Sequence, residues 1–276
     1  GLKKKMLLSA TRTDEIPPFV KIHNPMILEF LGESGQKINL TKYIVHSPVK
    51  DKLESLMKLI CQIGNEPILI FVNYRESVER VANYLRKNGA DCKMFHGGME
   101  QVDREKALFQ FKSGSSYLLV STDLAARGLD ILDVKHVIHY HLPVNQEAYT
   151  HRNGRTARMF AEGNAYIILH GEEKLPEYLL EDDFSDYPLL DNPPALKPSA
   201  WISLYIGKGK KDKLSKGDIA GFLMKKGLLE KNQIGTIEVY EKCSYASVAR
   251  SEMNALLKRI RNEKIKGLKT IFEESK

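Results

Sequence analysis

The sequence "SYLLVSTDLAARGLDI", residues 116–131, joins a short apolar run directly to small and polar residues. An apolar run of this length is typical of a strand buried on both faces of a sheet. The small residues that follow allow the backbone to approach a ligand, Thr122 can donate a hydrogen bond to a phosphate oxygen, and Asp130 can accept one from a ribose hydroxyl. We interpret this stretch as a loop that contacts a nucleotide or a nucleic acid. The alternative is a turn in which Thr122 or Asp123 caps a short helix.

The same alternation of apolar strand and amphipathic helix repeats along residues 41–172. It predicts an α/β domain, a parallel sheet covered by helices on both faces. Such sheets bind ligands at the carboxyl ends of their strands, so the residues directly after each strand are the site candidates. Strands are predicted at 42–47, 67–72, 92–96, 116–122, 135–143 and 164–170, and helices at 50–63, 75–89, 101–114 and from about 146.

Residues 201–276 follow a different pattern, in the order βαββαβ. This order predicts a small α+β domain, an antiparallel sheet backed by two helices. Between the two domains, residues 175–200 are acidic and hold five of the eleven prolines, which is the composition of a linker. Strands are predicted at 201–207, 234–242, 245–250 and 264–274, and helices at 215–227 and 251–262.

The net charge of +7 is distributed unevenly along the chain. Residues 201–276 hold 17 Lys and Arg against 9 Asp and Glu, whereas residues 172–200 hold 2 against 8. A basic domain behind an acidic connector predicts a polyanionic partner for the C-terminal domain. The alternative is a solvated lysine surface without a partner.

Composition places the chain among folded proteins of the cytoplasm. The sequence is 42% hydrophobic and 28% charged, and it contains no apolar run of the ~18–20 residues that span a membrane. The three cysteines, Cys61, Cys92 and Cys243, are odd in number and far apart, which argues against a disulfide framework and a zinc site. We therefore expect a cytoplasmic protein with no membrane partner.

Histidines cluster in "HVIHYH", where the alternation of a strand puts His139 and His141 on one face and His136 on the other. Two imidazoles without a third ligand make a poor metal site, so we predict no metal ligands in this chain.

Three arginines recur at a spacing of three in "HRNGRTAR", residues 151–158. Their charges repel one another unless an anion or a carboxylate lies among them. Arginines at the carboxyl edge of a sheet suit phosphoryl transfer, because they stabilise the negative charge of the transition state.

Five motifs in fixed order resemble the C-terminal half of a DEAD-box RNA helicase, over about residues 3–172. They are "LLSAT" (7–11), "LIFVNYRE" (69–76), "QVDR" (101–104), "STDLAARGLDI" (121–131) and "HRNGRTAR" (151–158). The last motif departs from the family pattern at Asn153, where isoleucine is usual, and at Ala157, where glycine is usual. These two departures concern local loop packing and leave the arginines in place.

The resemblance implies a RecA-like domain organisation. Residues 1–30 would be the end of a truncated first RecA-like domain with an interdomain linker, and residues 31–174 would be the helicase C-terminal RecA-like domain. Residues 175–200 would be the acidic, proline-rich linker, and residues 201–276 an RRM-like domain. We find no GxxxxGK[ST] phosphate loop and no Asp-Glu-Ala-Asp box. We therefore expect the ligands of Mg²⁺ in a first domain that this chain lacks.

The resemblance assigns the arginine motif to catalysis. Arg155 and Arg158 would reach the γ-phosphate of ATP across the interdomain cleft. His151 and Arg152 would tie the motif to the partner domain, and Asp130 would hold the ribose.

The other motifs would hold RNA by its sugar-phosphate backbone without reading bases. The residues that match the family in this role are Thr122, Arg104, Asn73 and Arg75.

The tail resembles the RNA-binding domain of the DbpA type, which is RRM-like and anchors helicases to ribosomal RNA during ribosome assembly. The matching segments are residues 203–223, 234–250 and 264–267. Lys208, Lys210 and Lys211 lie on a loop after the first predicted strand and suit phosphates. Tyr245 is a candidate for stacking on a base, with core packing as the alternative.

These observations predict the RNA-binding portion of an ATP-dependent RNA helicase that unwinds structured RNA, with ribosomal RNA as the expected target. The chain alone should be inactive. The alternative is a non-enzymatic RNA-binding protein that keeps only the second helicase domain and the tail. A DNA helicase is disfavoured by the RNA-type tail.

Overall fold

The computed structural model describes residue 26 and residues 39–126, 134–156 and 162–275. The chain divides into two compact units, Gly1–Lys37 and Ile38–Lys276. The elements below all belong to the second unit. The predicted "LLSAT" motif, Asp130 and Arg158 lie outside the described residues.

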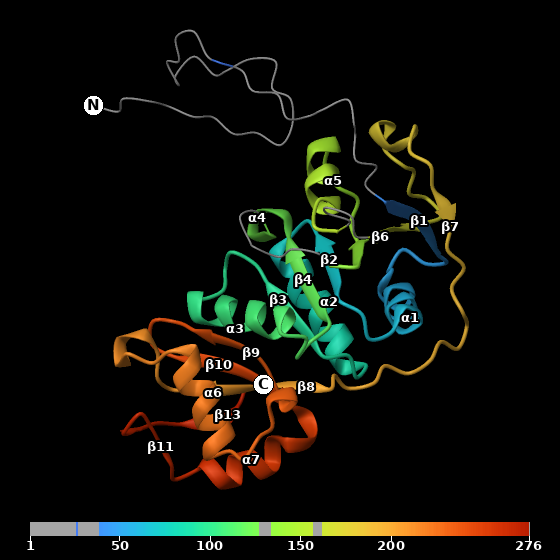
Figure 1. The fold of residues 1–276 in the computed structure, drawn as a ribbon. Helices are drawn as coiled ribbons and strands as arrows, with labels where there is room; N and C mark the ends of the chain where they lie inside the picture. The colour runs from blue at the N-terminus through green and yellow to red at the C-terminus, as the bar shows by residue number, and fades with distance from the viewer. Residues whose placement is uncertain (1–25, 27–38, 127–133, 157–161, 276) are drawn as a thin grey trace. The chain divides into compact units, whose positions relative to one another are not determined.

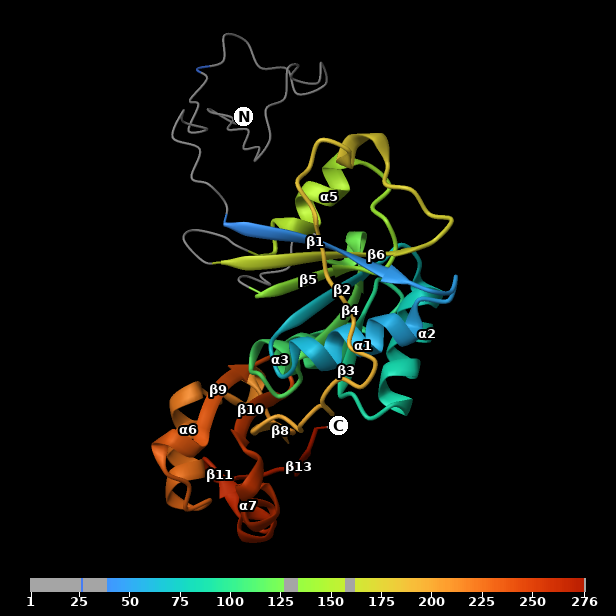
Figure 2. The same cartoon turned by 90° about the vertical axis from the view of Figure 1, so that its right-hand side faces the viewer.

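The first domain is a seven-stranded sheet in which every pairing is parallel. The strand order is β3-β4-β2-β5-β6-β1-β7, and Figure 2 shows all but the edge strand β7 following one another as a single layer. The strands are β1 Leu40–Ser47, β2 Ile68–Val72, β3 Cys92–Phe95, β4 Leu118–Thr122, β5 His136–His139, β6 Gly163–His170 and β7 Ser185–Asp186.

Helices cover both faces of this sheet (Figure 1), because successive side chains of a buried strand point to opposite faces. In β2, Ile68 and Ile70 pack with α1 and α2, whereas Leu69 and Phe71 pack on the other face with Phe111 of α3. The helices are α1 Leu53–Ile63, α2 Arg75–Lys87, α3 Gln101–Lys112, α4 Asp123–Ala126 and α5 Gln146–Asn153. The predicted parallel α/β architecture is confirmed.

The segment predicted as a linker is packed against the first domain over much of its length. Leu179, in a short 3₁₀ turn, is fully buried beside β6, and β7 adds to the edge of the sheet at β1. Tyr187 and Leu196 pack against the cluster below α1 and α2. The acidic and proline-rich composition predicted a linker, but the apolar residues of this segment pack on the sheet and helices of the first domain.

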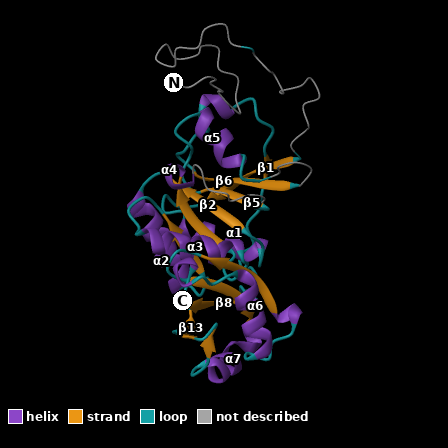
Figure 3. Cartoon of the chain, turned by 60° about the vertical axis from the view of Figure 1, so that its left-hand side comes forward, coloured by secondary structure: helices purple, strands orange, loops and turns teal. Residues whose placement is uncertain are grey.

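The C-terminal domain is a four-stranded antiparallel sheet in the order β13-β8-β10-β9. One hydrophobic cluster joins its inner face to two helices, and Figure 3 shows these helices beside the strands. The predicted split βαβ arrangement is confirmed. The elements are β8 Trp201–Ile206, α6 Lys216–Lys225, β9 Ile234–Val239, β10 Ser244–Ala249, α7 Met253–Ile260 and β13 Phe272–Glu274.

The prediction of one unbroken strand at 264–274 was wrong. A small hairpin, β11 Lys264–Ile265 and β12 Leu268–Lys269, precedes β13. Lys266 and Gly267 both have positive φ, 52° and 78°, as a type I′ hairpin turn requires at its two central residues.

Candidate functional site

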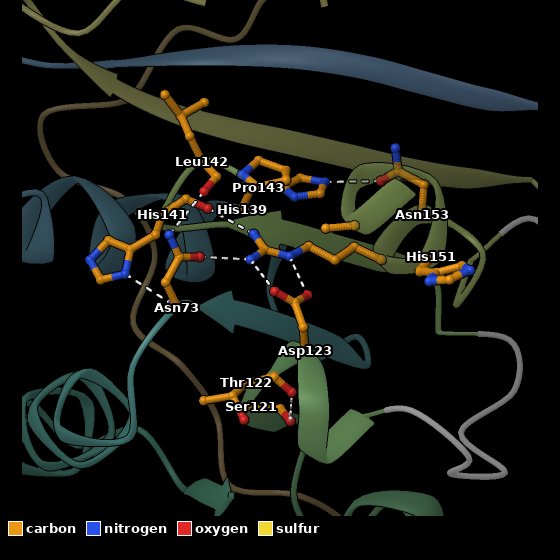
Figure 4. Close-up of polar contacts among 12 residues, drawn as sticks. Asn73, Ser121, Thr122, Asp123, His139, His141, Leu142, Pro143, His151 and Asn153 are labelled. Atoms are coloured by element: carbon orange, nitrogen blue, oxygen red, sulfur yellow. Dashed lines mark hydrogen bonds and ion pairs between the residues drawn. The ribbon is translucent and has the colours of Figure 1, made fainter. Parts of the chain in front are cut away.

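Three neighbouring strands of the first domain end at one sheet edge, and each is followed by a polar residue. Asn73 follows β2, Asp123 follows β4 and His141 lies two residues beyond β5. The strands are adjacent and parallel in the order β4-β2-β5, so these three residues converge (Figure 4). The convergence confirms that the residues after the strands gather at one edge.

Arg152 of α5 holds this edge together. Its Nε and Nη2 atoms donate to the two carboxylate oxygens of Asp123 at 2.6 and 2.7 Å, a bidentate ion pair. Nη1 donates to the carbonyl oxygen of His141 and Nη2 to Oδ1 of Asn73, both at 2.8 Å. The guanidinium lies 5.2 Å from the ring centroid of Phe71, and the side chain is 0% exposed. One buried cation thus ties three strand ends to α5.

His141 is held as a neutral imidazole. The backbone N–H of Asn73 donates to its Nδ1 at 3.1 Å, which places the proton on Nε2. Burial, with the nearby cations Lys52 and Arg152, lowers the pKa of His141 to about 4. The side-chain amide of Asn73 donates to the carbonyl oxygen of Leu142 at 3.1 Å, so the loops after β2 and β5 are bonded directly to each other.

Asn153, which stands where the family motif usually has isoleucine, has a hydrogen-bond partner in the structure. His139, fully buried in β5, donates from Nε2 to Oδ1 of Asn153 at 2.9 Å. Burial, together with the charge of Arg152, lowers the pKa of His139 to about 3, so this imidazole is neutral. An isoleucine at position 153 would leave that N–H of His139 unpaired. The polar pair therefore explains why the local packing tolerates an amide here.

The structure does not support the contact with a partner domain that the resemblance implies for Arg152. The side chain is inaccessible, and each of its nitrogens bonds to a group of its own domain. Arg152 is a positioning residue of this edge.

Arg155 and His151 lie beside this network. The amide of Arg155 donates to the carbonyl oxygen of Arg152, and its own carbonyl oxygen accepts from Val134, both at 3.1 Å. These bonds fix the turn after α5. His151 is 41% exposed, with Nδ1 3.9 Å from a carboxylate oxygen of Glu147. A shallow hollow is lined by Phe71, Asp123, Ala126, Ala148, His151, Arg152 and Arg155.

The predicted RNA contacts divide between two places. Thr122 ends β4 and is 8% exposed, and a short helix begins directly after it at Asp123. Arg104 donates from Nη2 to Oε1 of Gln101 at 2.7 Å on the first turns of α3. Arg75 is exposed, and its guanidinium lies beside Gly97 in the turn before α3. A Cβ atom added to Gly97 would be 3.4 Å from Nη2 of Arg75. The arginines therefore gather near the start of α3, while Asn73 belongs to the Arg152 network.

The predicted phosphate-binding lysines differ in their surroundings. Lys208 is paired with Asp212 at 2.9 Å, whereas Lys210 and Lys211 are exposed on the following 3₁₀ turn. The amides of Lys210 and Lys211 donate to the carbonyl oxygens of Tyr240 and Glu241 at 2.9 and 3.1 Å. Backbone bonds therefore fix the loop while two ammonium groups remain in solvent.

Tyr245 is packed rather than presented. It is 2% exposed and stacks on Phe109 of α3, with ring centroids 5.4 Å apart and an angle of 27° between the planes. Burial raises its pKa above the ordinary tyrosine value. In this arrangement the ring has no free face for a base, so the structure agrees with the packing alternative and not with stacking on RNA.

Sequence reasoning missed Asp123 and His141 as members of the site. Both stand inside quoted motifs, and the signal that could have found them is their position directly after predicted strands. The arginine repeat predicted an anion or a carboxylate among its members, and Asp123 is such a carboxylate for Arg152.

The comparisons with known proteins agree with this geometry. Residues 51–160 match the helicase conserved C-terminal domain, and residues 203–274 match the DbpA RNA binding domain. The ATP-dependent RNA helicase DbpA of Bacillus subtilis (strain 168) is 28% identical over 291 residues, which cover 95% of this chain and 61% of that protein. DbpA of Escherichia coli (strain K12) is 32% identical over 223 residues, which cover 79% of this chain and 49% of that protein.

A solved structure supports the first domain. The E. coli DEAD-box protein SrmB, crystallised bound to regulator of ribonuclease activity A, has a TM-score of 0.51 at 30% identity and covers 57% of this chain and 96% of that chain. Fold and site thus define a RecA-like helicase domain joined to an RNA-binding domain. The chain belongs to the DEAD-box RNA helicases, corresponds to their C-terminal portion and is homologous to DbpA. It spans 61% and 49% of the length of these two relatives.

Proposed function

We propose that this chain is the RNA-binding portion of an ATP-dependent helicase that locally unwinds structured RNA. The observation that carries the proposal is the Arg152 network, which fixes Asn73, Asp123 and the turn bearing Arg155 at one sheet edge. This edge is where parallel sheets bind ligands. Closure of two helicase domains over ATP and RNA would bend one strand, and hydrolysis would release it.

ATP contacts are proposed for Arg155, Arg158 and Asp130, as the helicase resemblance implies. The support from the structure is the fixed turn at Arg155 and the hollow that it shares with His151. A guanidinium at this edge suits a polyanion, because it is always charged and donates several hydrogen bonds. ATP would supply the phosphoryl group for transfer, and Mg²⁺ would be held by residues of a first helicase domain.

RNA contacts are proposed for Thr122, Arg104 and Arg75 in the first domain and for Lys208, Lys210 and Lys211 in the second. Asn73 is proposed to contact RNA at the same edge. The support is the exposure of Arg75, Lys210 and Lys211 and the +8 balance of residues 201–276. Because backbone contacts give affinity without sequence information, these residues would grip RNA of any sequence.

Structured ribosomal RNA is the proposed target, and ribosome assembly the proposed process. The support is the match of residues 203–274 to the DbpA RNA binding domain. We propose a cytoplasmic location because the cysteines are unpaired, as a reducing compartment favours. None of the described helices is long and apolar enough to cross a membrane.

The catalytic part is tested by Arg155→Ala in the protein completed by a first helicase domain. An arginine finger contributes roughly 10³–10⁵ in rate, so we expect RNA-stimulated ATP turnover to fall by at least about 10²-fold while RNA affinity changes little. Arg80→Ala is the matched control, because Arg80 is an exposed arginine of α2 that pairs with Asp51. Equal turnover in Arg155→Ala and the parent protein would remove Arg155 from the catalytic assignment.

A further inference from the structure

The C-terminal domain touches the helicase domain through one face of α3. Phe109 of α3 and Tyr245 of β10 are 1% and 2% exposed and stack with ring centroids 5.4 Å apart. Cys243 completes this buried cluster, and Tyr205 and Tyr240 pack around it. A stacked aromatic pair stabilises a contact beyond the apolar area that it buries.

Hydrogen bonds close the same seam along α3 and at the turn that follows it. The side chain of Gln110 donates to the carbonyl oxygen of Ser275 at 2.7 Å, and this bond is buried. The hydroxyl of Ser199 donates to the carbonyl oxygen of Gly114 at 2.5 Å. At the other end, the hydroxyl of Tyr240 donates to the carbonyl oxygen of Glu105 at 3.4 Å. The contact is therefore built from matched polar groups as well as from the ring stack.

Helix α3 has two buried faces, which explains an otherwise irregular sequence. Phe111 packs with Leu108 against the sheet of the helicase domain. Phe109 lies on another face of the helix, one turn along from Glu105, and both contact the C-terminal domain. A helix of an isolated helicase domain would need only the first of these faces.

The face of the C-terminal sheet that meets α3 is the one opposite its helices. Leu204 and Ala246 point to the helices and belong to their cluster, whereas the cross-strand partners Tyr205 and Tyr245 point away from them. A standard RRM-like sheet uses this outer face as a platform on which bases stack. In this chain Phe109 covers the centre of that platform.

The basic loop is connected to the seam by backbone hydrogen bonds. The amide of Lys210 donates to the carbonyl oxygen of Tyr240, whose hydroxyl reaches Glu105 of α3. Arg104, a proposed RNA contact, lies five residues before Phe109, about 8 Å along the helix axis. A short, fully bonded path therefore joins the two places where RNA phosphates are proposed to bind.

We infer that the outer sheet face is a docking surface for α3, and that the Phe109–Tyr245 stack positions RNA held by the lysine loop relative to Arg104. This inference rests on the proposed function for its RNA part. The RNA-binding domain is then a fixed extension of the helicase domain. Bases of the RNA must then be read by surfaces of this domain other than the covered sheet face.

The native cysteines report on docking. Cys243 lies in the seam and is 6% exposed, Cys61 is partly exposed, and Cys92 is 0% exposed inside the helicase domain. Burial raises the pKa of the Cys243 thiol, which slows its reaction with maleimide further. We expect Phe109→Lys to increase the labelling rate of Cys243 roughly tenfold or more, and to increase the radius of gyration measured by X-ray scattering.

One variant serves as the control for this measurement. Leu190→Lys adds the same charge at an exposed apolar position whose backbone amide contacts Gln62 of α1, on the opposite side of the sheet from α3. This variant should label Cys243 at the parent rate, and Cys92 should stay unlabelled in every folded variant. Unchanged labelling and an unchanged radius in Phe109→Lys would overturn the docking.

The positioning role is tested in the protein completed by a first helicase domain. With a duplex attached to an anchoring RNA hairpin, we expect Phe109→Lys to slow unwinding by roughly tenfold at saturating RNA, while unwinding of a duplex without the hairpin is unchanged. Equal slowing of both duplexes, or of neither, would overturn positioning. If the parent protein unwinds no RNA at all, the proposed function fails, and the docking is still judged by the labelling of Cys243.

Discussion

At the residue scale, the buried Arg152 side chain, with a partner for each of its nitrogens, defines the helicase-domain edge. Arg152 is enclosed, yet Asp123, Asn73 and His141 supply acceptors for its guanidinium. Removal of one partner from a buried ion pair is costly because the remaining charge stays desolvated. The arrangement therefore specifies one geometry of the strand ends, and the turn bearing Arg155 follows from it.

The His139–Asn153 pair gives a prediction at this scale. We expect His139→Leu and Asn153→Ile each to lower the free energy of unfolding by about 1–3 kcal/mol, because each leaves its partner buried and unpaired. The double variant leaves neither group unpaired and should be much closer to the parent than the sum of the two losses. Urea unfolding of the four proteins at pH 7 measures this. Additive losses would show that the two side chains are independent.

The same double variant should alter the pH dependence of stability. The pKa of His139 is about 3 in the folded protein and ordinarily about 6.5 in an unfolded chain. Between these two pKa values the unfolded state binds one more proton than the folded state. The free energy of unfolding therefore keeps the full contribution of neutral His139 above about pH 6.5 and loses it as the pH falls toward about 3. Replacing His139 should reduce the slope between pH 4 and 6 by about 1.4 kcal/mol per pH unit.

At the element scale, neighbouring residues of one short segment differ in whether their charge is paired within the protein or exposed to solvent. In the loop after β8, Lys208 is paired with Asp212, whereas Lys210 and Lys211 are exposed. In α3, one face packs on the sheet and another on the C-terminal domain. The two elements are joined through Tyr240, whose carbonyl oxygen accepts from the amide of Lys210 and whose hydroxyl donates to the carbonyl oxygen of Glu105 in α3.

The lysine loop gives a prediction at this scale. Removing one lysine that binds a phosphate reduces the slope of log affinity against log salt concentration by roughly 0.7–0.9. We expect Lys210→Ala with Lys211→Ala to flatten the slope for an RNA hairpin by about 1.4–1.8, and Lys208→Ala to change it less, because Lys208 is already paired. Titrations of the whole chain at several salt concentrations, against a hairpin and a scrambled RNA, measure both effects. A larger change from Lys208→Ala would contradict this assignment.

At the scale of the whole molecule, two domains of different architecture meet at α3, a helix of the helicase domain. The proposed ATP contacts come from the first domain, and the phosphate loop and acidic box are not in the sequence. We therefore expect the 276-residue chain to hydrolyse no ATP above background, and addition of a first helicase domain to produce RNA-stimulated turnover. Release of phosphate with and without RNA measures this. RNA-dependent hydrolysis by the chain alone would contradict the division of roles.

Sequence alone determined both architectures, because strand and helix periodicities are local properties of the chain. The run at 116–122 and the order βαββαβ predicted the two sheets correctly, and the motifs placed Arg152 and Arg155 near one edge. The hairpin at Lys266 and Gly267 was missed, since a two-residue turn interrupts the strand pattern only slightly.

Tertiary structure decided which charged and aromatic residues are available. Arg152 and Arg155 belong to one motif, yet the first is enclosed by Asp123 and Asn73, which come from distant parts of the sequence. Tyr245 had two interpretations until Phe109, 136 positions earlier in the chain, was found against its ring. Periodicity shows which side of a strand a residue faces. It does not show what covers that side, because burial depends on surfaces brought together by folding.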